Sequence, residues 1–373
     1  MPHSDKPELI YLGRSRLHRN RANLIQTLHT VAAFTEIGIR TRLYLPPWHD
    51  NVTPEQRLRE MGIRSKLDIR RTQLLHRRWP VSAFIRFHGR LLRSTRAVYV
   101  RSHELSLGLA SRGIVHHYEV HTLQPIIARG QLQAILDFHL RGLIDRLIPI
   151  SHSIARALIA AGADAQRIHV SPSGVDLSAY EALPPLDTAR FSRPRIVYLG
   201  RISRDRGLDI LTHLAEHAQG EVLLAGDCDD AVTQSPQLHY RPAVPHREVP
   251  GLYAACELVV LPYQPDLIHA DGISPMKLFE AMAAGRPIIA SDMAPIREIL
   301  QHGHNALLVN PGDPLAWEHA VQCLQQDPGL ALKLAAQAKR DVTAYSWTRR
   351  AAGIAQAIGL SAPRTGGENV HAR

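Results

Sequence analysis

The segment Asp271 to Pro287, DGISPMKLFEAMAAGRP, combines the signals of a helix start with a lysine and a glutamate. Ser274 is a good N-cap, Pro275 suits the first helical position, and a glycine and a proline close the segment, so a short helix is predicted. Free N–H groups and the positive dipole end at such an N-terminus favour an anion, above all a phosphate. Lys277 would add positive charge there, and Glu280 could accept hydrogen bonds from a vicinal diol such as a ribose. An ordinary capped helix with a solvated Lys and Glu is the alternative.

A second segment, Ile196 to Gly207 (IVYLGRISRDRG), places two arginines around a predicted strand-to-helix loop. Gly200 ends a β-branched strand, Arg201 follows it, and Arg206 precedes the next helix. Two guanidinium groups in such a loop can hold a diphosphate and neutralise the charge that grows on it as a leaving group. A solvated basic loop balanced by Asp205 is the alternative.

The composition limits the class of protein that could carry these segments. The chain has 373 residues, 45% of them hydrophobic, which predicts about two domains with proper cores and excludes disordered and disulfide-stapled classes. The first residues are polar and no apolar run approaches the length of a membrane span, so a cytosolic protein is expected. The three cysteines are far apart, and neither a zinc site nor a disulfide framework is indicated.

Short apolar runs alternate with amphipathic stretches twice along the chain, the pattern of parallel strands joined by helices. The sequence therefore predicts an α/β protein with two doubly wound domains and a ligand cleft at the carboxyl ends of the strands. The predicted strands are Leu9–Leu12, Thr41–Leu45, Ala97–Val100, Ile114–Glu119, Leu147–Ile150, Arg195–Leu199, Gly220–Ala225, Leu258–Pro262, Pro287–Ala290 and Ala306–Val309.

Proline-rich and polar stretches indicate where the domains are expected to begin and end. A proline-rich stretch without periodicity, 181–194, predicts a linker between an N-terminal domain, 1–180, and a second domain, 195–345. A late helix, 346–360, is expected to end the second domain, and the polar tail 361–373 is expected to be disordered. Further helices are predicted at Asn23 to Glu36 and Ser151 to Ala161.

The net charge of +10 is unevenly distributed. Residues 1–180 hold 26 Lys and Arg against 13 Asp and Glu, a net of +13, whereas residues 181–373 hold 18 against 21, a net of −3. The stretch from Ile69 to His103 has nine arginines and no acid, and Val81 to Arg96 can form a basic amphipathic helix. Contact with an anionic membrane surface and a core-packed helix with a solvated basic face are both open. Aromatic residues are few and no nucleic-acid module is recognisable, so nucleic acid is not expected as a partner.

Several motifs together resemble the retaining GT-B glycosyltransferases of family 4 (glycosyl transferases group 1), and in particular the subgroup with an SPxKLFE donor motif. The similar segments are HVSPSGVD (His169 to Asp176), IVYLGRISRDRG, VPHREVPGLYAACELVVLPY (Val244 to Tyr263), SPMKLFEAMAAGRPIIASDMAPIREIL (Ser274 to Leu300), YEVH (Tyr118 to His121) and PISHSIARAL (Pro149 to Leu158). The resemblance covers roughly residues 8–358. It implies a GT-B fold of two Rossmann-like domains facing each other across a cleft. It also implies transfer of a sugar from a nucleoside diphosphate sugar with retention, and no obligatory metal or other cofactor.

The resemblance also assigns roles to residues of the second domain. Arg201 and Arg206 match the family's two cations for the donor diphosphate, and Lys277 resembles a residue that faces the phosphates or the sugar. Glu280 matches the second Glu of the family's Glu, seven residues, Glu motif, which holds the ribose. The first Glu of that motif is replaced by Gly272, and Asp271 is adjacent but one position out of register. Asp271, Gly272, Ile273, Ser274 and Gly200 complete the expected donor-binding set.

In the N-terminal domain, the resemblance assigns His121 a place near the transferred sugar. The family's glycine-rich first loop is replaced by Arg19-Asn20-Arg21-Ala22-Asn23, and Arg19, Arg21 or Asn23 is expected to meet the donor diphosphate or an anionic acceptor. The base, the sugar and the acceptor stay open, with UDP- and GDP-sugars as the donors considered. The acceptors considered are a glycan, a lipid-linked intermediate of cell-envelope polysaccharide biosynthesis and a small molecule. A peripheral position on the inner face of the membrane is a further expectation. A nucleotide-sugar epimerase or hydrolase, and a non-catalytic nucleotide-sugar-binding protein, are the other functions compatible with this scaffold.

Overall fold

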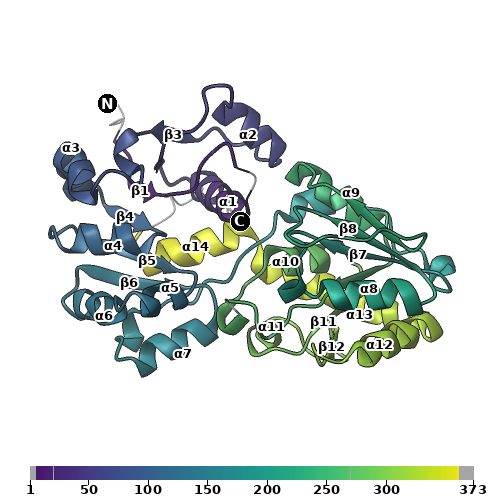
Figure 1. Cartoon of the computed structure of the whole chain (residues 1–373). Helices are drawn as coiled ribbons and strands as arrows, with labels where there is room; N and C mark the ends of the chain where they lie inside the picture. Colours follow the sequence, from purple (N-terminus) through teal and green to yellow (C-terminus); the bar gives the residue numbers. More distant parts are fainter. Residues whose placement is uncertain (1–5, 20, 269, 361–373) are drawn as a thin grey trace, which may run out of the picture.

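The computed structural model describes residues 6–19, 21–268 and 270–360, with the side chain of Asp271 also outside the described part. The predicted disordered tail, Asn20 and His269 therefore lie outside it. Within the described residues, the chain forms two parallel six-stranded sheets covered by helices, one in each half (Figure 1). The expected GT-B architecture of two Rossmann-like domains is confirmed.

The first sheet has the strand order β3-β2-β1-β4-β5-β6, and all of its pairings are parallel. Its strands are β1 Leu9–Leu12, β2 Thr41–Leu45, β3 Asp68–Arg71, β4 Ala97–Val100, β5 His116–Val120 and β6 Ile144–Pro149. Its helices are α1 Ala22–Glu36, α2 Pro54–Glu60, α3 Val81–Ser94, α4 His103–Ala110, α5 Gln124–Ala128, α6 Leu132–Leu140 and α7 His152–Ala160.

The second sheet has the order β12-β11-β10-β7-β8-β9 and is also wholly parallel. Its strands are β7 Arg195–Leu199, β8 Glu221–Ala225, β9 Leu238–Arg241, β10 Leu258–Leu261, β11 Ile288–Ser291 and β12 Leu307–Val309. The helices that follow it are α8 Leu208–His217, α9 Val249–Ala254, α10 Met276–Ala283, α11 Ala294–Arg297, α12 Pro314–Gln326, α13 Pro328–Asp341 and α14 Trp347–Ala357.

Both faces of each sheet are buried, which explains why the central strands read as continuous apolar runs. In β1, Leu9 and Tyr11 enter one hydrophobic core while Ile10 and Leu12 enter the other, as the two-residue period of a strand requires. All ten predicted strands occur, with ends that differ by at most three residues. The two unpredicted strands, β3 and β9, are edge strands with polar, partly exposed sequences.

The last helix, α14, does not pack as expected. The sequence predicts that it ends the second domain, but its apolar side chains, among them Ala351 and Ile354, join the core beside α1 of the first domain (Figure 1). The chain crosses back where Ser346 pairs with Val175, so the two segments that join the domains are hydrogen bonded to each other. The last helix thus covers apolar side chains of α1 and of the first-domain core.

Candidate active site between the domains

A pocket of about 590 Å³ lies where the carboxyl ends of β7 and β8 meet the first turn of α10 and the start of α1. Because helices follow parallel strands at this edge, it is the place where α/β sheets bind ligands. The polar side chains that line it come from both domains. They are Arg21 and Asn23 from the first and Arg201, Arg206, Asp227, His246, Tyr263, Lys277 and Glu280 from the second.

Lys277 is partly buried at the base of this pocket. Its Nζ lies 3.9 Å from the ring centroid of Tyr198 and 5.4 Å from that of Tyr263, so aromatic faces take the place of water around the amine. Burial, and then the charge of Arg206, lower the pKa of Lys277 to about 7. Gly200 is required beside it, because its φ is 125° and a Cβ there would come within 2.6 Å of the amine. An anion in the pocket would restore the charge on this lysine.

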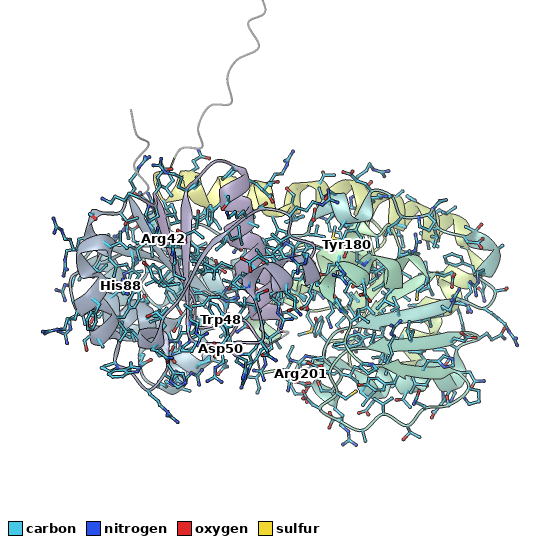
Figure 2. All side chains as sticks on the ribbon, turned by 90° about the horizontal axis from the view of Figure 1, so that it is seen from above. Arg42, Trp48, Asp50, His88, Tyr180 and Arg201 are labelled. Atoms are coloured by element: carbon cyan, nitrogen blue, oxygen red, sulfur yellow. The ribbon has the colours of Figure 1, made fainter. Side chains whose placement is uncertain are left out.

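The two arginines that the sequence singled out reach the same pocket with acidic partners already in place. Arg201 is half-exposed and bonds both carboxylate oxygens of Asp229, and Figure 2 shows it on the side of the second domain that faces the first. Arg206 donates from Nη1 to the hydroxyl of Ser203 at 2.9 Å and to Asp205 at 3.0 Å. A bound diphosphate would compete with these carboxylates for the guanidinium groups. Arg206 thus pairs with Asp205, as the alternative interpretation of this loop supposed, but its side chain is largely buried at the pocket. Arg201 pairs with an acid from the loop after β8.

The loop that carries these arginines is fixed by Gly207, which precedes α8. Its φ is 83°, and a Cβ would come within 2.1 Å of the carbonyl oxygen of Pro262. A left-handed backbone and this close approach leave room for glycine alone. The short 3₁₀ turn Arg204–Arg206 is thereby held against the end of β10.

Glu280 lies one turn further along α10, buried, with its carboxylate beside His246. His246 Nε2 is 2.7 Å from Glu280 Oε1, and both residues line the pocket. Burial opposes charge on His246, but the hydrogen bond and the charge of Glu280 raise the pKa of this imidazole above its ordinary value. The ion pair leaves the second carboxylate oxygen as an acceptor. His246 was not singled out in the sequence, because it is one of 22 histidines and its partner is 34 residues away.

The expected capping role of Ser274 is wrong. Its hydroxyl instead accepts a hydrogen bond from the backbone N–H of Ser173 at 2.9 Å, and its carbonyl accepts the Ser173 hydroxyl at 2.7 Å. Helix α10 begins at Met276 behind Pro275, and no side chain caps its first turn. The N–H groups at this end, which faces the pocket, are therefore available to an anion.

The other residues of the predicted donor-binding set have mainly backbone or packing roles. The carbonyl of Gly272 accepts a hydrogen bond from the Ser151 hydroxyl at 3.4 Å, across the domain boundary. Ile273 packs against the core of the second domain. The prediction that Asp271 replaces the missing first glutamate concerns a side chain outside the described part.

The arginine-containing loop of the first domain reaches the pocket in part. Arg21 and Asn23 line it, and the positive charge of Arg21 is close enough to lower the pKa of Asp229, although the hydrogen bonds of Arg201 have the larger effect. Arg19 is exposed and does not line either of the two pockets.

His121 lies directly after β5 on the first domain and is mostly buried. Its Nε2 bonds Glu119, and its Nδ1 is 3.3 Å from Arg101 Nη2. Burial, and then Arg101, lower the pKa of His121 to about 4, so the ring is neutral near pH 7. Arg101 in turn donates to the backbone oxygen of Asn23 at 2.6 Å. His121 is therefore connected to the pocket through the start of α1 rather than lining it.

A second, larger cavity of about 1140 Å³ adjoins the first and shares His246 and Glu280 with it. It is bounded by α1, the α2 end, the segment joining the domains and the start of α14. Across the described residues, no group of three or more His, Cys, Asp or Glu side chains is placed to hold a metal ion.

A similarity to a known family lies within the second domain. Residues 193–327 match the family described as Glycosyl transferases group 1. The match spans the pocket residues of the second domain, His246 and Glu280 among them, and it does not include the first domain.

Curated relatives resemble a longer part of the chain. The chain is 30% identical over 237 residues to a D-inositol 3-phosphate glycosyltransferase of Xylanimonas cellulosilytica, 56% of this chain and 55% of the relative. It is 26% identical over 236 residues to the D-inositol 3-phosphate glycosyltransferase 1 of Catenulispora acidiphila, 55% of this chain and 54% of the relative. The chain thus spans about half the length of the curated relatives it matches.

Solved structures share the whole fold at low sequence identity. Alr3699/HepE of Anabaena, in complex with UDP and glucose, superposes with a TM-score of 0.72 at 17% identity, covering 95% of this chain and 99% of that one. Sucrose-phosphate synthase of Thermosynechococcus elongatus gives a TM-score of 0.71 at 18% identity, covering 94% and 98%. These likenesses establish the two-domain architecture.

Proposed function

We propose that this protein is a glycosyltransferase that moves a sugar from a nucleoside diphosphate sugar, UDP- or GDP-linked, to an acceptor hydroxyl with retention of configuration. The observation that carries the proposal is the pocket that surrounds one space with Arg201, Arg206, Lys277, the uncapped start of α10 and the buried Glu280. The family match over residues 193–327 includes all of these groups. Three structures of HepE, which hold UDP and glucose, UDP, or UDP-glucose, favour a UDP-sugar as the first donor to test.

The mechanism follows from where the charges lie. The donor diphosphate takes the place between the arginines and the α10 N-terminus, and Glu280 accepts hydrogen bonds from the ribose. The acceptor oxygen forms a bond to the anomeric carbon on the face from which the diphosphate departs, the bond from that carbon to the phosphate oxygen breaks, and the acceptor proton passes to the departing diphosphate. The cations stabilise the charge that develops on the leaving group. No nucleophile from the protein is required.

A cationic surface on the first domain fits an anionic acceptor. Glu104 lies 3.0 Å from Arg129 Nη1 and 3.8 Å from Arg14 Nη1, and the charge of Arg77 acts on Arg14 and on His103 as well. Glu104 is thus one acid beside several arginines, so a phosphate group could accept hydrogen bonds from guanidinium groups that Glu104 does not neutralise. A phosphorylated small molecule, glycan or lipid-linked intermediate is the proposed acceptor. The curated relatives named for D-inositol 3-phosphate support this choice.

A peripheral position on an anionic membrane surface is proposed as well. Helix α3 buries Phe84, Ile85 and Leu92 while Arg86 and Arg90 are exposed, and it lies on the side of the first domain away from the second (Figure 1). No helix within the described residues is long and apolar enough to cross a membrane.

The test of the function is a transfer assay with UDP- and GDP-sugars and two acceptors, D-inositol 3-phosphate and unphosphorylated inositol. Transfer to the phosphorylated acceptor is expected. Arg201→Ala and Glu280→Ala are each expected to reduce transfer about 100-fold or more, because each removes a charge or a hydrogen bond acceptor at the diphosphate or the ribose. Arg204→Ala, in the same loop but with a side chain 77% exposed, is the matched control and should retain wild-type turnover.

The same reactions are run without acceptor and analysed for free or epimerised sugar. Epimer or free sugar as the main product would replace the proposal by an epimerase or hydrolase, and tight UDP binding without turnover on a broad acceptor panel would replace it by a binding protein. Wild-type turnover in either site variant would overturn the site assignment.

A further inference from the structure

A fully buried carboxylate lies directly beneath His121. Glu119 and His121 are two residues apart at the end of β5, so their side chains leave the strand on the same face. Glu119 is completely enclosed, and its oxygens bond the Tyr99 hydroxyl and His121 Nε2. A charge in this position needs a compensating partner, because desolvation would otherwise neutralise it.

The partner comes from the last helix of the chain. Arg350 on α14 is buried, and its Nη2 lies 3.3 Å from Glu119 Oε1. Its Nε donates to the carbonyl of Pro172 at 2.8 Å and its Nη1 to the Thr30 hydroxyl at 3.1 Å. Burial would raise the pKa of Glu119, but the charge of Arg350 and the hydrogen bond from His121 lower it below its ordinary value. Glu119 is therefore held as a carboxylate.

The hydrogen bonds fix the tautomer of His121. Arg101 is only a donor, so the Nδ1 that it faces must be the acceptor. The proton is then on Nε2, which donates it to Glu119. The ring is held on both sides, by an arginine that also bonds the start of α1 and by a carboxylate that Arg350 anchors.

The ion pair is not what attaches α14 to the first domain. Ala351, Ile354, Ala355 and Ile358 already pack in the core with α1. A buried ion pair contributes little net stability, since the loss of hydration offsets the attraction between the charges. Apolar side chains at both positions 119 and 350 would hold the helix about as well, so stability alone does not account for the charged pair.

We propose that Arg350 is a positioning residue for His121, acting through Glu119, and that α14 thereby completes the first-domain side of the active site. The inference rests on the proposed function and on the sequence-based prediction that His121, which contacts the start of α1 through Arg101, lies near the transferred sugar. It adds that the segment following the donor domain returns to the acceptor domain to fix the orientation and tautomer of that histidine.

The experiment compares Arg350→Met, Glu119→Gln and the double variant with both changes. The double variant removes both charges of the pair, so neither is left buried without its partner to disturb folding. With the donor and acceptor established in the transfer assay, kcat is expected to fall about 10- to 100-fold in each, because a small displacement of a group at the reacting centre is costly. The KM for donor and the affinity for UDP should stay within twofold, since the nucleotide pocket is untouched. Arg350→Lys should recover part of the lost kcat. Arg349→Met, the exposed neighbour on the same helix, is the matched control.

A second readout does not depend on activity. Nitrogen-15 spectra of the histidine rings, assigned for His121 by comparison with His121→Gln, should show the Nε2–H tautomer in the wild type and a mixture of tautomers in the double variant. Unchanged kcat together with an unchanged His121 signal in a folded double variant overturns the positioning role. Wild-type turnover in His121→Gln would count against the role assigned to His121 itself, and this outcome is separate from failure at Arg350.

Discussion

Lys277 occupies a place where a charged amine is costly. It is enclosed by two tyrosine rings, and the nearest cation, Arg206, adds repulsion. The pKa of about 7 follows, and it means that the free protein above pH 7 holds this lysine mostly neutral. A diphosphate in the pocket brings negative charge to the same point and favours the protonated form.

Nucleotide binding should therefore take up a proton. At pH 8, binding of UDP-glucose is expected to absorb a fraction of a proton approaching one, because the lysine is mostly neutral before binding and mostly charged afterwards. The affinity should fall as the pH rises above about 7, by up to about tenfold per unit, until the raised pKa of the complex is reached. Calorimetry in two buffers with different ionisation enthalpies measures the uptake. Lys277→Met should show none, and equal uptake in wild type and variant would contradict the assignment.

At the residue scale, the sequence predicted the groups that lie within a motif and missed those that come from elsewhere in the chain. Arg201, Arg206, Lys277 and Glu280 all lie at the pocket. Asp229, which pairs with Arg201, is 28 residues away, so no local spacing indicates it. Glu119 was predictable in part, because a two-residue separation from His121 on a strand implies a shared face. Its pairing with Arg350 depends on the return of α14 and has no local signal.

At the element scale, the amphipathic pattern of the sequence predicted helices and strands correctly where one face of the element is buried. Helix α3 buries the apolar positions that its period predicted and exposes arginines between them. Edge strands gave no such signal: β3 (DIRR) and β9 (LHYR) are paired on one side only and are largely exposed. β3 has a single apolar residue, and the alternation in β9 extends over only four residues, too few for hydrophobic periodicity to indicate a strand.

The exposed side of α3 and the loop before it make a specific prediction about membranes. Phe87 is 72% exposed and Trp79 is 50% exposed, beside the exposed Arg78, Arg86 and Arg90. An aromatic and basic surface of this kind binds anionic lipid by inserting its rings while the arginines meet the head groups. Co-sedimentation with vesicles containing phosphatidylglycerol should be strong at low salt and weaker at moderate salt.

Variants separate the contribution of the aromatic rings to membrane binding from that of the arginines. Phe87→Ala with Trp79→Ala should reduce binding at both salt concentrations, and Arg86→Gln with Arg90→Gln should reduce mainly the salt-sensitive part. Ile268→Ala, an equally exposed apolar residue on the second domain, is the control and should bind as the wild type does. No sedimentation of the wild type at either salt concentration would remove the membrane proposal.

At the scale of the whole molecule, the two domains are joined by more than the linker. The crossing segments pair at Val175 and Ser346, and α14 lies on the first domain although it follows the second. A further link is made by Glu298 at the end of α11, which is 10% exposed. Its carboxylate accepts the backbone N–H groups of His152 and Ser153, each at 2.7 Å, and the Ser153 hydroxyl at 2.8 Å. A second-domain acid thus caps the N-terminus of α7 in the first domain, where the dipole favours a negative charge.

Removal of this carboxylate should loosen the relation between the domains. Glu298→Ala leaves the donors at the start of α7 without their partner, and we expect it to lower the free energy of unfolding by about 2–4 kcal/mol. Glu298→Gln, which keeps acceptor capacity without the charge, should cost less. Urea titration measures both, with Glu216→Ala on the exposed side of α8 as the control. Because the same contact holds the domains in one arrangement, Glu298→Ala should also speed proteolysis of the segments that cross between the domains, near Val175 and Ser346, under native conditions. The predicted linker 181–194 packs on the second domain, where Phe191 is buried, and should not become more sensitive. If the unfolding free energy and the rate of proteolysis of Glu298→Ala both match the wild type, the Glu298 contact does not hold the domains together. The paired crossing segments and α14 would then be sufficient to fix the relative position of the domains.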